Sequence, residues 1–305
     1  MKIMTFGEIV WDVPAREGDA TLGGAPLNFS AHLAKLGAAV HLISAVGEDE
    51  LGEKALQAAK NHGIGCDFIR ENGFPTGVVE VSGDEGNPQY YIVPNAAYDY
   101  IEVPDNLPQD LSEYSFYFGT LAQRSSVSRN TLSSLLSSNS FKKIFCDINI
   151  RKNSYDEGSL KLCLQHANIL KISRAEIGVF PDLKLTASAV DKRSANENDY
   201  MDFCQEICSK YHGVEIIIIT LDKDGSMLYD RKQGAMIESE KPQVDSIVDT
   251  VGAGDSFGAC FFYNYLGGKP LKKCIDRATL LSSYVITQRG AVCDYPDELK
   301  EKIVD

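Results

Sequence analysis

Segments typical of strands alternate with segments typical of helices along most of this 305-residue chain, which restricts the folds it can adopt. Within the predicted strand 215–221, Ile216-Ile217-Ile218-Ile219 is apolar and β-branched, as in a strand buried on both faces of a parallel sheet. Further predicted strands span 2–10, 40–46, 115–119, 143–148, 169–172 and 226–229. Predicted helices span 27–36, 50–62, 199–211 and 272–287, the last of which closes the chain. This order predicts a central, mostly parallel sheet covered by helices.

One stretch, residues 74–98, interrupts this alternation. Its two short β runs, 77–81 and 89–93, flank a segment rich in turn-forming residues, which indicates a hairpin. Together with the loop 11–22, the hairpin is expected to form a small β lid. We therefore predict a single domain over 1–305, with a lid subdomain contributed by about 11–22 and 74–98.

The segment 249–258 places small residues and a carboxylate where a loop meets an apolar helix. Gly252-Ala253-Gly254 is followed by Asp255, and the helix is apolar from Phe257 onward. Backbone N–H groups at a helix N-terminus lack acceptors within the helix, and the helix dipole is positive there, so the segment can hold an anion. Asp255 is a candidate general base for a hydroxyl. An anion site beside a base indicates phosphoryl transfer to an alcohol.

Simpler interpretations of this segment stay open on these residues alone. An Asp at a helix start is usually an N-cap, and Gly-rich turns are common. The spacing Gly252-x-Gly254-x-x-x-Gly258 is one residue too long for the dinucleotide fingerprint, which disfavours an NAD-dependent dehydrogenase. The chain has no GxxxxGK[ST] run and is therefore not a P-loop protein.

A companion motif lies near the other end of the chain. Leu22-Gly23-Gly24-Ala25-Pro26-Leu27-Asn28 precedes the helical stretch 29–37. The two segments together resemble the two signatures of the PfkB family, the ribokinase-like sugar kinases, and the resemblance covers nearly the whole chain. It implies a ribokinase-like three-layer α/β sandwich with a central, mostly parallel sheet and a small β lid. It also implies an enzyme that transfers the γ-phosphoryl group of ATP to a sugar hydroxyl, with Asp255 as the base and residues 252–254 in the anion site.

The resemblance implies that one group of residues binds the sugar, namely Asp12, Gly23, Gly24, Asn28 and Arg151. The glycines let the backbone approach a polar ring, and Asn28 can both donate and accept hydrogen bonds. Arg151 ends the run Asp147-Ile148-Asn149-Ile150-Arg151, which resembles the DxNxR segment of fructokinase-like and ketodeoxygluconate-kinase-like members. The alternative for Arg151 is a surface ion pair with Asp147 or Glu157.

A second group is implied to bind ATP and cations. The nucleotide residues implied are Ser173, Thr220, Gly225, Gly254 and Ser283. Glu176 is implied to organise Mg²⁺ through water and phosphates, and Asp249 to hold a monovalent cation such as K⁺. For Asp249 the alternative is a loop residue that bonds local backbone. Two residues depart from the family pattern, because Ser173 replaces an Asn and Asp222 replaces the commoner Gly.

Composition limits the partners and the compartment. The net charge of −13 and pI near 4.9 argue against nucleic acid and anionic membranes, since both attract basic patches. The eight cysteines form no CxxC pair and predict a reduced, cytoplasmic protein. We find no secretion signal and no apolar run long enough to span a membrane.

The substrate is predicted from the same motifs. Gly-Gly-Ala-Pro-x-Asn and the opening Gly7-Glu8-Ile9-Val10-Trp11-Asp12 both look like fructokinases, which predicts fructose and the product fructose 6-phosphate. Ribose, tagatose and 2-keto-3-deoxygluconate would involve the same chemistry. A non-catalytic sugar- or nucleotide-binding regulator is the alternative from another class. The exposed edge of the lid further predicts a homodimer.

Overall fold

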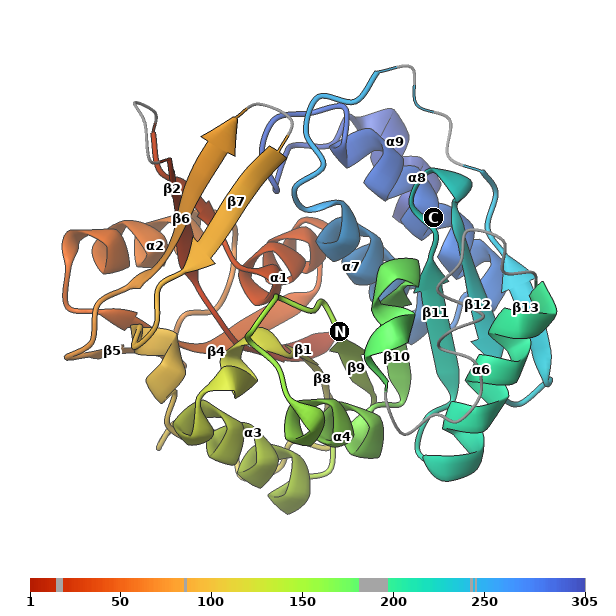
Figure 1. Ribbon diagram of the computed structural model, residues 1–305, viewed down its shortest axis with the longest axis horizontal. Helices are drawn as coiled ribbons and strands as arrows, with labels where there is room; N and C mark the ends of the chain where they lie inside the picture. The colour runs from red at the N-terminus through yellow and green to blue at the C-terminus, as the bar shows by residue number, and fades with distance from the viewer. Residues whose placement is uncertain (15–18, 85–86, 181–196, 242–243, 245, 305) are drawn as a thin grey trace.

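A nine-stranded sheet forms the centre of the computed structural model, as the ribbon in Figure 1 shows. The structure describes residues 1–14, 19–84, 87–180, 197–241, 244 and 246–304. The strand order is β13-β12-β11-β10-β9-β8-β1-β4-β5. Neighbours pair in parallel except β11 with β12 and β12 with β13, which confirms the mostly parallel sheet. The strands are β1 (Lys2–Phe6), β4 (Ala39–Gly47), β5 (Ile69–Asn72), β8 (Tyr114–Gly119), β9 (Ile144–Asp147), β10 (Ile169–Ser173), β11 (Ile216–Thr220), β12 (Ser226–Asp230) and β13 (Ala235–Glu238).

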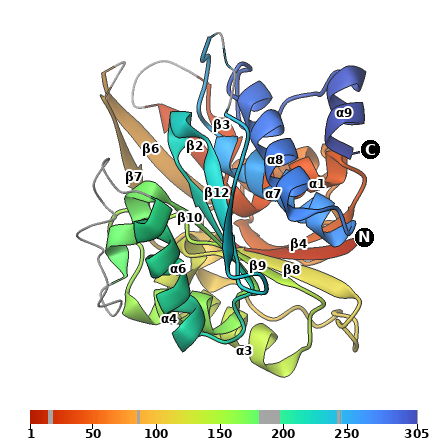
Figure 2. The same cartoon turned by 90° about the vertical axis from the view of Figure 1, so that its right-hand side faces the viewer.

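Helices cover both faces of this sheet and make three layers (Figure 2). One face carries α1 (Ala25–Lys35), α2 (Glu50–Asn61), α7 (Ala253–Leu266), α8 (Leu271–Val285) and α9 (Asp297–Val304). The other face carries α3 (Ser126–Ser138), α4 (Glu157–His166) and α6 (Glu197–Lys210). Short 3₁₀ turns lie at Ala97–Tyr100, Leu121–Arg124, Arg174–Val179 and Asp222–Asp224.

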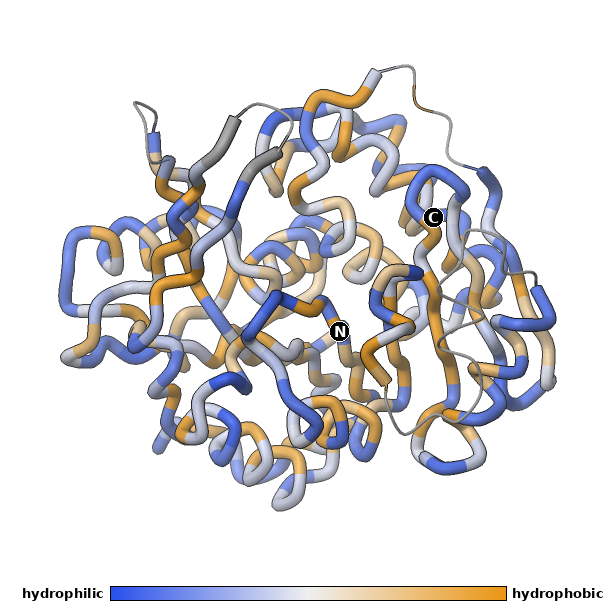
Figure 3. The backbone as a smooth tube through the Cα atoms, viewed as in Figure 1, coloured by the Kyte–Doolittle hydropathy of each residue, from blue (hydrophilic) through white to orange (hydrophobic). Residues whose placement is uncertain are grey.

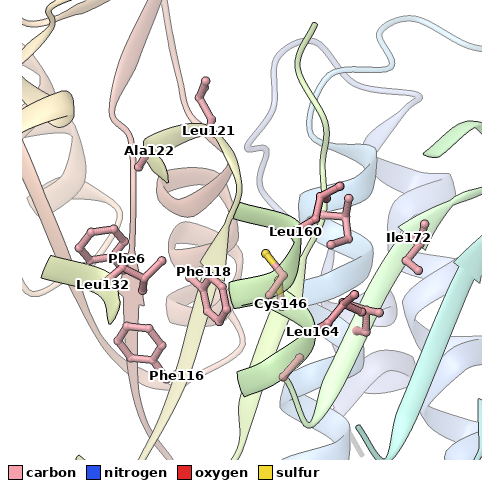
Figure 4. Packing of buried hydrophobic residues seen from close by; sticks show 14 of the residues in the cluster. Phe6, Phe116, Phe118, Leu121, Ala122, Leu132, Cys146, Leu160, Leu164 and Ile172 are labelled. Atoms are coloured by element: carbon pink, nitrogen blue, oxygen red, sulfur yellow. The ribbon is translucent and has the colours of Figure 1, made fainter. Parts of the chain in front are cut away.

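Successive side chains of the central strands point to opposite helical layers. In β8, Phe116 and Phe118 join the cluster beneath α3 and α4, which Figure 4 shows, whereas Tyr117 points to the other layer. There Tyr117 stacks on Phe29 of α1 with 3.7 Å between the ring centroids. Apolar residues therefore run along the central strands (Figure 3), as expected for a sheet that is covered on both faces.

A second, four-stranded sheet stands beside the central one. Its order is β3-β2-β6-β7, formed by β2 (Val10–Pro14), β3 (Thr21–Gly23), β6 (Gly77–Asp84) and β7 (Asn87–Ile92). The antiparallel β6–β7 pair confirms the predicted hairpin, while the stretch 11–22 contributes strands instead of only a loop. Residues 15–18 and 85–86, which belong to the predicted lid, lie outside the described residues.

The predicted strand 2–10 was wrong in its extent, because β1 ends at Phe6 and β2 belongs to the second sheet. Gly7 adopts φ 145°, and a Cβ at this position would lie 2.6 Å from Cγ of Pro26. The chain therefore turns at Gly7 and enters the second sheet. The prediction that the helix 272–287 closes the chain was also wrong, since α9 follows and packs Leu299 and Ile303 onto the same core as α7 and α8. No helix among the described residues is long and apolar enough to cross a membrane.

His32 connects α1 to the C-terminal segment from inside the protein. Its Nε2 donates to the carbonyl oxygen of Ala291 at 2.9 Å, so Nδ1 is left to accept a hydrogen bond from the hydroxyl of Tyr295. Burial lowers the pKa of His32 to about 4, and the Ala291 hydrogen bond opposes that shift. The imidazole is therefore neutral in the folded protein at neutral pH, and this segment also contacts the N-terminus of α7.

This network predicts a pH-dependent loss of stability. Between about pH 6.5 and pH 4 the unfolded chain binds a proton at His32 while the folded chain does not, so the free energy of unfolding falls as pH falls, by up to about 3 kcal/mol in all. Urea unfolding at several pH values measures the effect. In His32→Gln, whose amide can replace both hydrogen bonds without titrating, the slope in this window is expected to be shallower. If the free energy of unfolding changed equally with pH in both proteins, the assignment of this effect to His32 would be contradicted.

Candidate active site

The carboxyl ends of the parallel strands carry several of the predicted residues. Asp147 ends β9, Ser173 ends β10 and Thr220 lies at the end of β11. Parallel strands place these ends on one edge of the sheet, where ligands of α/β proteins usually bind. A cavity of about 1220 Å³ opens at this edge beside the second sheet, and its lining includes Asp12 from β2 and Asp255 from α7.

The N-terminus of α7 faces this cavity. Gly252 is its N-cap with φ 79°, and a Cβ there would overlap the backbone of Ala291, so only glycine fits. Gly252 and Gly254 both line the cavity. The amide of Ala253 makes only a long hydrogen bond, 3.4 Å, to the carbonyl of Thr250. The first turn of α7 therefore presents backbone N–H groups and the positive end of a 14-residue helix to the cavity.

Asp255 lies in this first turn, buried beside the cavity. It is the third residue of the helix and not its N-cap, so the simple capping interpretation does not hold. Its Oδ2 accepts a hydrogen bond of 2.8 Å from Nδ2 of Asn28. Burial raises the pKa of Asp255, and the Asn28 hydrogen bond and the nearby Lys171 and Arg151 oppose that rise. A carboxylate held in this way has the position and basicity to take a proton from a bound hydroxyl.

The residues predicted to bind the sugar meet in the same cavity, since Asp12, Gly23, Gly24, Asn28 and Arg151 all line it. Gly24 has φ 111°, and a Cβ there would overlap the carbonyl oxygen of Glu8, so the chain can enter α1 only with glycine at this position. Burial raises the pKa of Asp12, which Arg151 partly offsets. The fold thus gathers residues from both ends of the sequence.

Arg151 does not form the ion pair that was its alternative. Its Nη1 donates to Oδ1 of Asn149 at 2.8 Å, within its own loop, and the side chain is exposed. Asp147 instead pairs with Lys171, and among the described residues Arg151 forms no ion pair with Glu157. Its guanidinium thus remains available to a ligand in the cavity.

A buried ion pair in the cavity wall was missed by the sequence analysis. Nζ of Lys171 donates to both carboxylate oxygens of Asp147, at 2.9 and 2.8 Å. Burial raises the pKa of Asp147 to about 6, against the opposing effect of Lys171. Nζ of Lys171 also lies 3.3 Å from where a Cβ on Gly254 would be, next to the predicted anion site. The available signal was a lysine inside an otherwise apolar strand, β10.

Glu8 is a second residue that the sequence analysis did not single out as a site residue. It lines the cavity and is almost fully buried, and burial raises its pKa to about 7, with Arg151 opposing and Asp255 adding to the rise. Its signal in the sequence was a single carboxylate within the otherwise mostly apolar run 3–10. The cavity thus holds three buried carboxyl groups with raised pKa values, those of Glu8, Asp147 and Asp255.

The residues predicted to bind ATP lie mostly outside this cavity. Ser173 Oγ donates to Glu176, and Ser283 Oγ donates to the carbonyl of Thr279 within α8. Neither these serines nor Thr220 and Gly225 belong to the described cavity lining, and Gly254 is the only one of the predicted ATP residues that does. Asp222, which replaces the commoner Gly, has φ 54°, so the backbone here explains why glycine is usual at this position.

The two predicted cation residues are engaged with local backbone. Glu176 accepts hydrogen bonds from the amides of Ile150 and Ser173, which leaves it bridging the loops after β9 and β10. Asp249 accepts from the amides of Val251 and Gly290, each at 3.0 Å. The described residues contain no cluster of three or more His, Cys, Asp or Glu side chains that could hold a metal ion.

Comparison with known proteins adds the decisive observation, a match of residues 10–298 to the model of the pfkB family carbohydrate kinases. The chain belongs to this family. It is 25% identical to the ribokinase of Dictyostelium discoideum over 90% of this chain and 86% of the relative. The 2-dehydro-3-deoxygluconokinase of Thermotoga maritima superposes with a TM-score of 0.81 at 20% identity, covering 100% and 99% of the two chains. The fructokinase of Xylella fastidiosa with bound ATP gives 0.79 at 20% identity, covering 95% and 93%.

Family membership confirms the predicted enzyme class. The protein is an ATP-dependent carbohydrate kinase, which transfers a phosphoryl group to a sugar hydroxyl, and the structural matches confirm the ribokinase-like fold. The predicted anion site at the start of α7, the adjacent Asp255 and the cavity beside the second sheet are consistent with this chemistry.

The buried Lys171–Asp147 pair predicts how the free energy of unfolding differs between single and double variants. Lys171→Met leaves the buried Asp147 carboxylate without its cation, so the free energy of unfolding in urea should drop by about 3–5 kcal/mol. Lys54→Met, which breaks an exposed pair with Glu50, is the matched control and should cost less than about 1 kcal/mol. The double variant Lys171→Met with Asp147→Leu should regain most of the loss. A double variant as unstable as Lys171→Met alone would contradict the ion-pair account.

Proposed function

We propose that this protein phosphorylates fructose at the 6-hydroxyl with ATP. The observation that carries the proposal is the position of Asp255, hydrogen-bonded to Asn28 and adjacent to the α7 amides, in a cavity that Asp12 also lines. Polar groups for sugar hydroxyls, a base and an anion site thus surround one space. The fructokinase-like segment from Gly23 to Asn28 and the fructokinase-like opening of the chain support fructose.

The chemistry follows from these positions. Asp255 would take the proton of the attacking sugar hydroxyl while its oxygen forms a bond to the γ-phosphorus of ATP. The bond from that phosphorus to the bridging oxygen of ADP breaks in the same displacement. The amides of Ala253, Gly254 and Asp255 would stabilise the charge on the transferring group. Closure of the second sheet over the cavity would exclude water, which otherwise competes as the acceptor.

A sugar acid is the second candidate, because of the cation at the sugar side of the cavity. Arg151 is exposed, lines the cavity, and hydrogen-bonds only within its own loop. A guanidinium fork binds a carboxylate with two parallel hydrogen bonds, so 2-keto-3-deoxygluconate would use Arg151 more fully than fructose does. Ribose and tagatose lack such a group and have no comparable observation in their favour.

We also propose the cofactors. ATP would enter as its Mg²⁺ complex, with Ser173, Thr220, Gly225 and Ser283 on the nucleotide side. Glu176 is occupied by two backbone amides and Ser173, so it would act on Mg²⁺ only through water and by holding the loops after β9 and β10. Asp249 orders the backbone of Gly290 by accepting its amide hydrogen bond, which supports a K⁺ site built with neighbouring carbonyls. The eight unpaired cysteines support a reducing compartment such as the cytoplasm.

ADP release with Mg-ATP and each candidate sugar tests the proposal directly. Fructose is expected to give the largest kcat/KM, with lower rates when Mg²⁺ is omitted or K⁺ is replaced by a large organic cation. A preference for 2-keto-3-deoxygluconate would replace the fructose assignment by the second candidate. If the protein binds ATP but releases no ADP with any of the sugars, both substrate assignments would be contradicted.

The role of Asp255 predicts a specific kinetic defect. Asp255→Asn keeps the side-chain shape and can still accept the Asn28 hydrogen bond, but it cannot take a proton. We therefore expect kcat to fall by about 10²–10⁴-fold while calorimetric affinities for ATP and sugar change little. Ser256→Ala, one residue further along the same helix, is the control and should retain most of the rate. Near-normal turnover by Asp255→Asn would contradict the assignment.

We further propose that the protein forms a homodimer through its second sheet. β7 is an edge strand of that sheet, and Tyr91 on it is 57% exposed. Sedimentation velocity should then give twice the chain mass of 33.5 kDa for the native protein. Tyr91→Lys should shift it toward the monomer, while Val103→Lys, an exposed position outside the sheet, should not. A monomeric native protein would contradict this proposal.

A further inference from the structure

A second cleft lies at the opposite edge of the central sheet, where the parallel strands begin. Its volume is about 1040 Å³, close to the upper limit of sites for small organic ligands. Residues just before β9 and β11 line it, together with the β12–β13 turn and the connection from α7 to α8. None of the residues assigned to phosphoryl transfer belongs to its lining.

The charge of this cleft is opposite to that of the protein. Its lining contains six Lys or Arg side chains and two carboxylates, a net charge of +4, whereas the whole chain carries −13. The six are Lys142, Lys143, Arg231, Lys232, Lys269 and Lys272. Like charges that gather in a concavity repel one another and attract counter-ions, so the arrangement favours an anionic ligand.

Much of this positive charge is not neutralised within the protein. Lys143 pairs with Glu215 at 2.5 Å, and Lys272 pairs with Asp276. Arg231, in contrast, donates to the backbone carbonyls of His212 and Val214 and lies 3.5 Å from Nδ1 of His212, and it forms no ion pair with a carboxylate among the described residues. Within the described part of the chain, Lys142 and Lys232 form no ion pair, and both are exposed.

The start of α8 adds to the positive potential. Its N-cap is Pro270, which offers no side-chain acceptor, and its first turn carries no acidic residue. Lys272 and Lys273 occupy that turn instead, at the positive end of a 15-residue helix dipole. Cations are unfavourable at this end of a helix, and an anion in the cleft would offset both the dipole and the lysines.

The floor of the cleft is apolar and partly aromatic. Ile237, Tyr265 and Leu266 are half-buried there, and the hydroxyl of Tyr265 is directed to Glu215 at 3.4 Å, which leaves its ring as part of the wall. Inorganic phosphate would use only the cationic rim. An organic body attached to the phosphate would also remove this apolar surface from water.

We propose that this cleft binds a phosphorylated small molecule, with its phosphate at the Lys142–Arg231–Lys232 rim and an apolar or aromatic body against Tyr265 and Leu266. The site is separate from the kinase cavity, and the proposal does not depend on which sugar the enzyme phosphorylates.

Isothermal titration calorimetry with naphthyl phosphate as the probe tests this site. The double variant Lys142→Glu with Lys232→Glu reverses two exposed charges at the rim and should weaken binding at least about tenfold. Lys60→Glu with Lys302→Glu is the matched control, since it changes the net charge equally at two exposed lysines outside the cleft. It should change the affinity less than about twofold, because charges beyond a Debye length are screened. Sugar kinase activity should be the same in both variants.

Several outcomes would overturn the proposal. Equal affinity of the native protein and the rim variant would place the probe elsewhere, for example in the ATP site. A native protein that binds naphthyl phosphate with a Kd above about 1 mM would show that the cleft is only a solvated basic surface. Inorganic phosphate that binds as tightly as naphthyl phosphate would contradict the role of the Tyr265 and Leu266 floor.

Discussion

The hydrogen bond from Asn28 to Asp255 is the contact on which the rest of the site depends. It joins two residues 227 positions apart, one in α1 and one in α7. It can form only because both helices lie on the same face of the sheet and approach closely. The ring of Phe29 lies 3.2 Å from where a Cβ on Gly258 would be, so a larger residue at position 258 would separate the helices. Packing in the core therefore sets the position of Asp255, the proposed base.

Burial makes the cavity suited to accept protons. The pKa values of Glu8, Asp147 and Asp255 are all raised, and desolvation is the first cause in each case. Among the described residues that line the cavity, Lys171 is the one buried cation, and it is held by Asp147. A bound Mg-ATP complex and a sugar hydroxyl would meet carboxyl groups that are more basic than usual, beside amides that favour negative charge. The proposed base and the backbone amides proposed to stabilise the transferring group thus lie within the same first turn of α7.

Much of this arrangement could be predicted from the sequence because it depends on local patterns. The apolar run in β11 predicts a buried parallel strand, and Gly252-Ala253-Gly254 predicts a helix start that can approach an anion. The turn at Gly7 could not be predicted, since it depends on contact with Pro26 in a later helix. Lys171 and Glu8 were missed because a single charged residue in or next to an apolar strand forms no recognisable spacing motif. Its role becomes apparent only when the neighbouring strands are placed. The second cleft could not be predicted either, because its lining comes from four segments that are distant in sequence.

The central claim is that Asp255 accepts the proton and that the hydrogen bond from Asn28 limits the rise of its pKa. The pH dependence of kcat for the native enzyme and for Asn28→Ala, measured at saturating sugar, tests it most directly. The Asn28 hydrogen bond lowers the pKa of Asp255, so its loss should raise that pKa and move the acid limb of the profile to higher pH. An acid limb that stays in place, with only KM for the sugar changed, would contradict the claim and leave Asn28 as a sugar ligand alone.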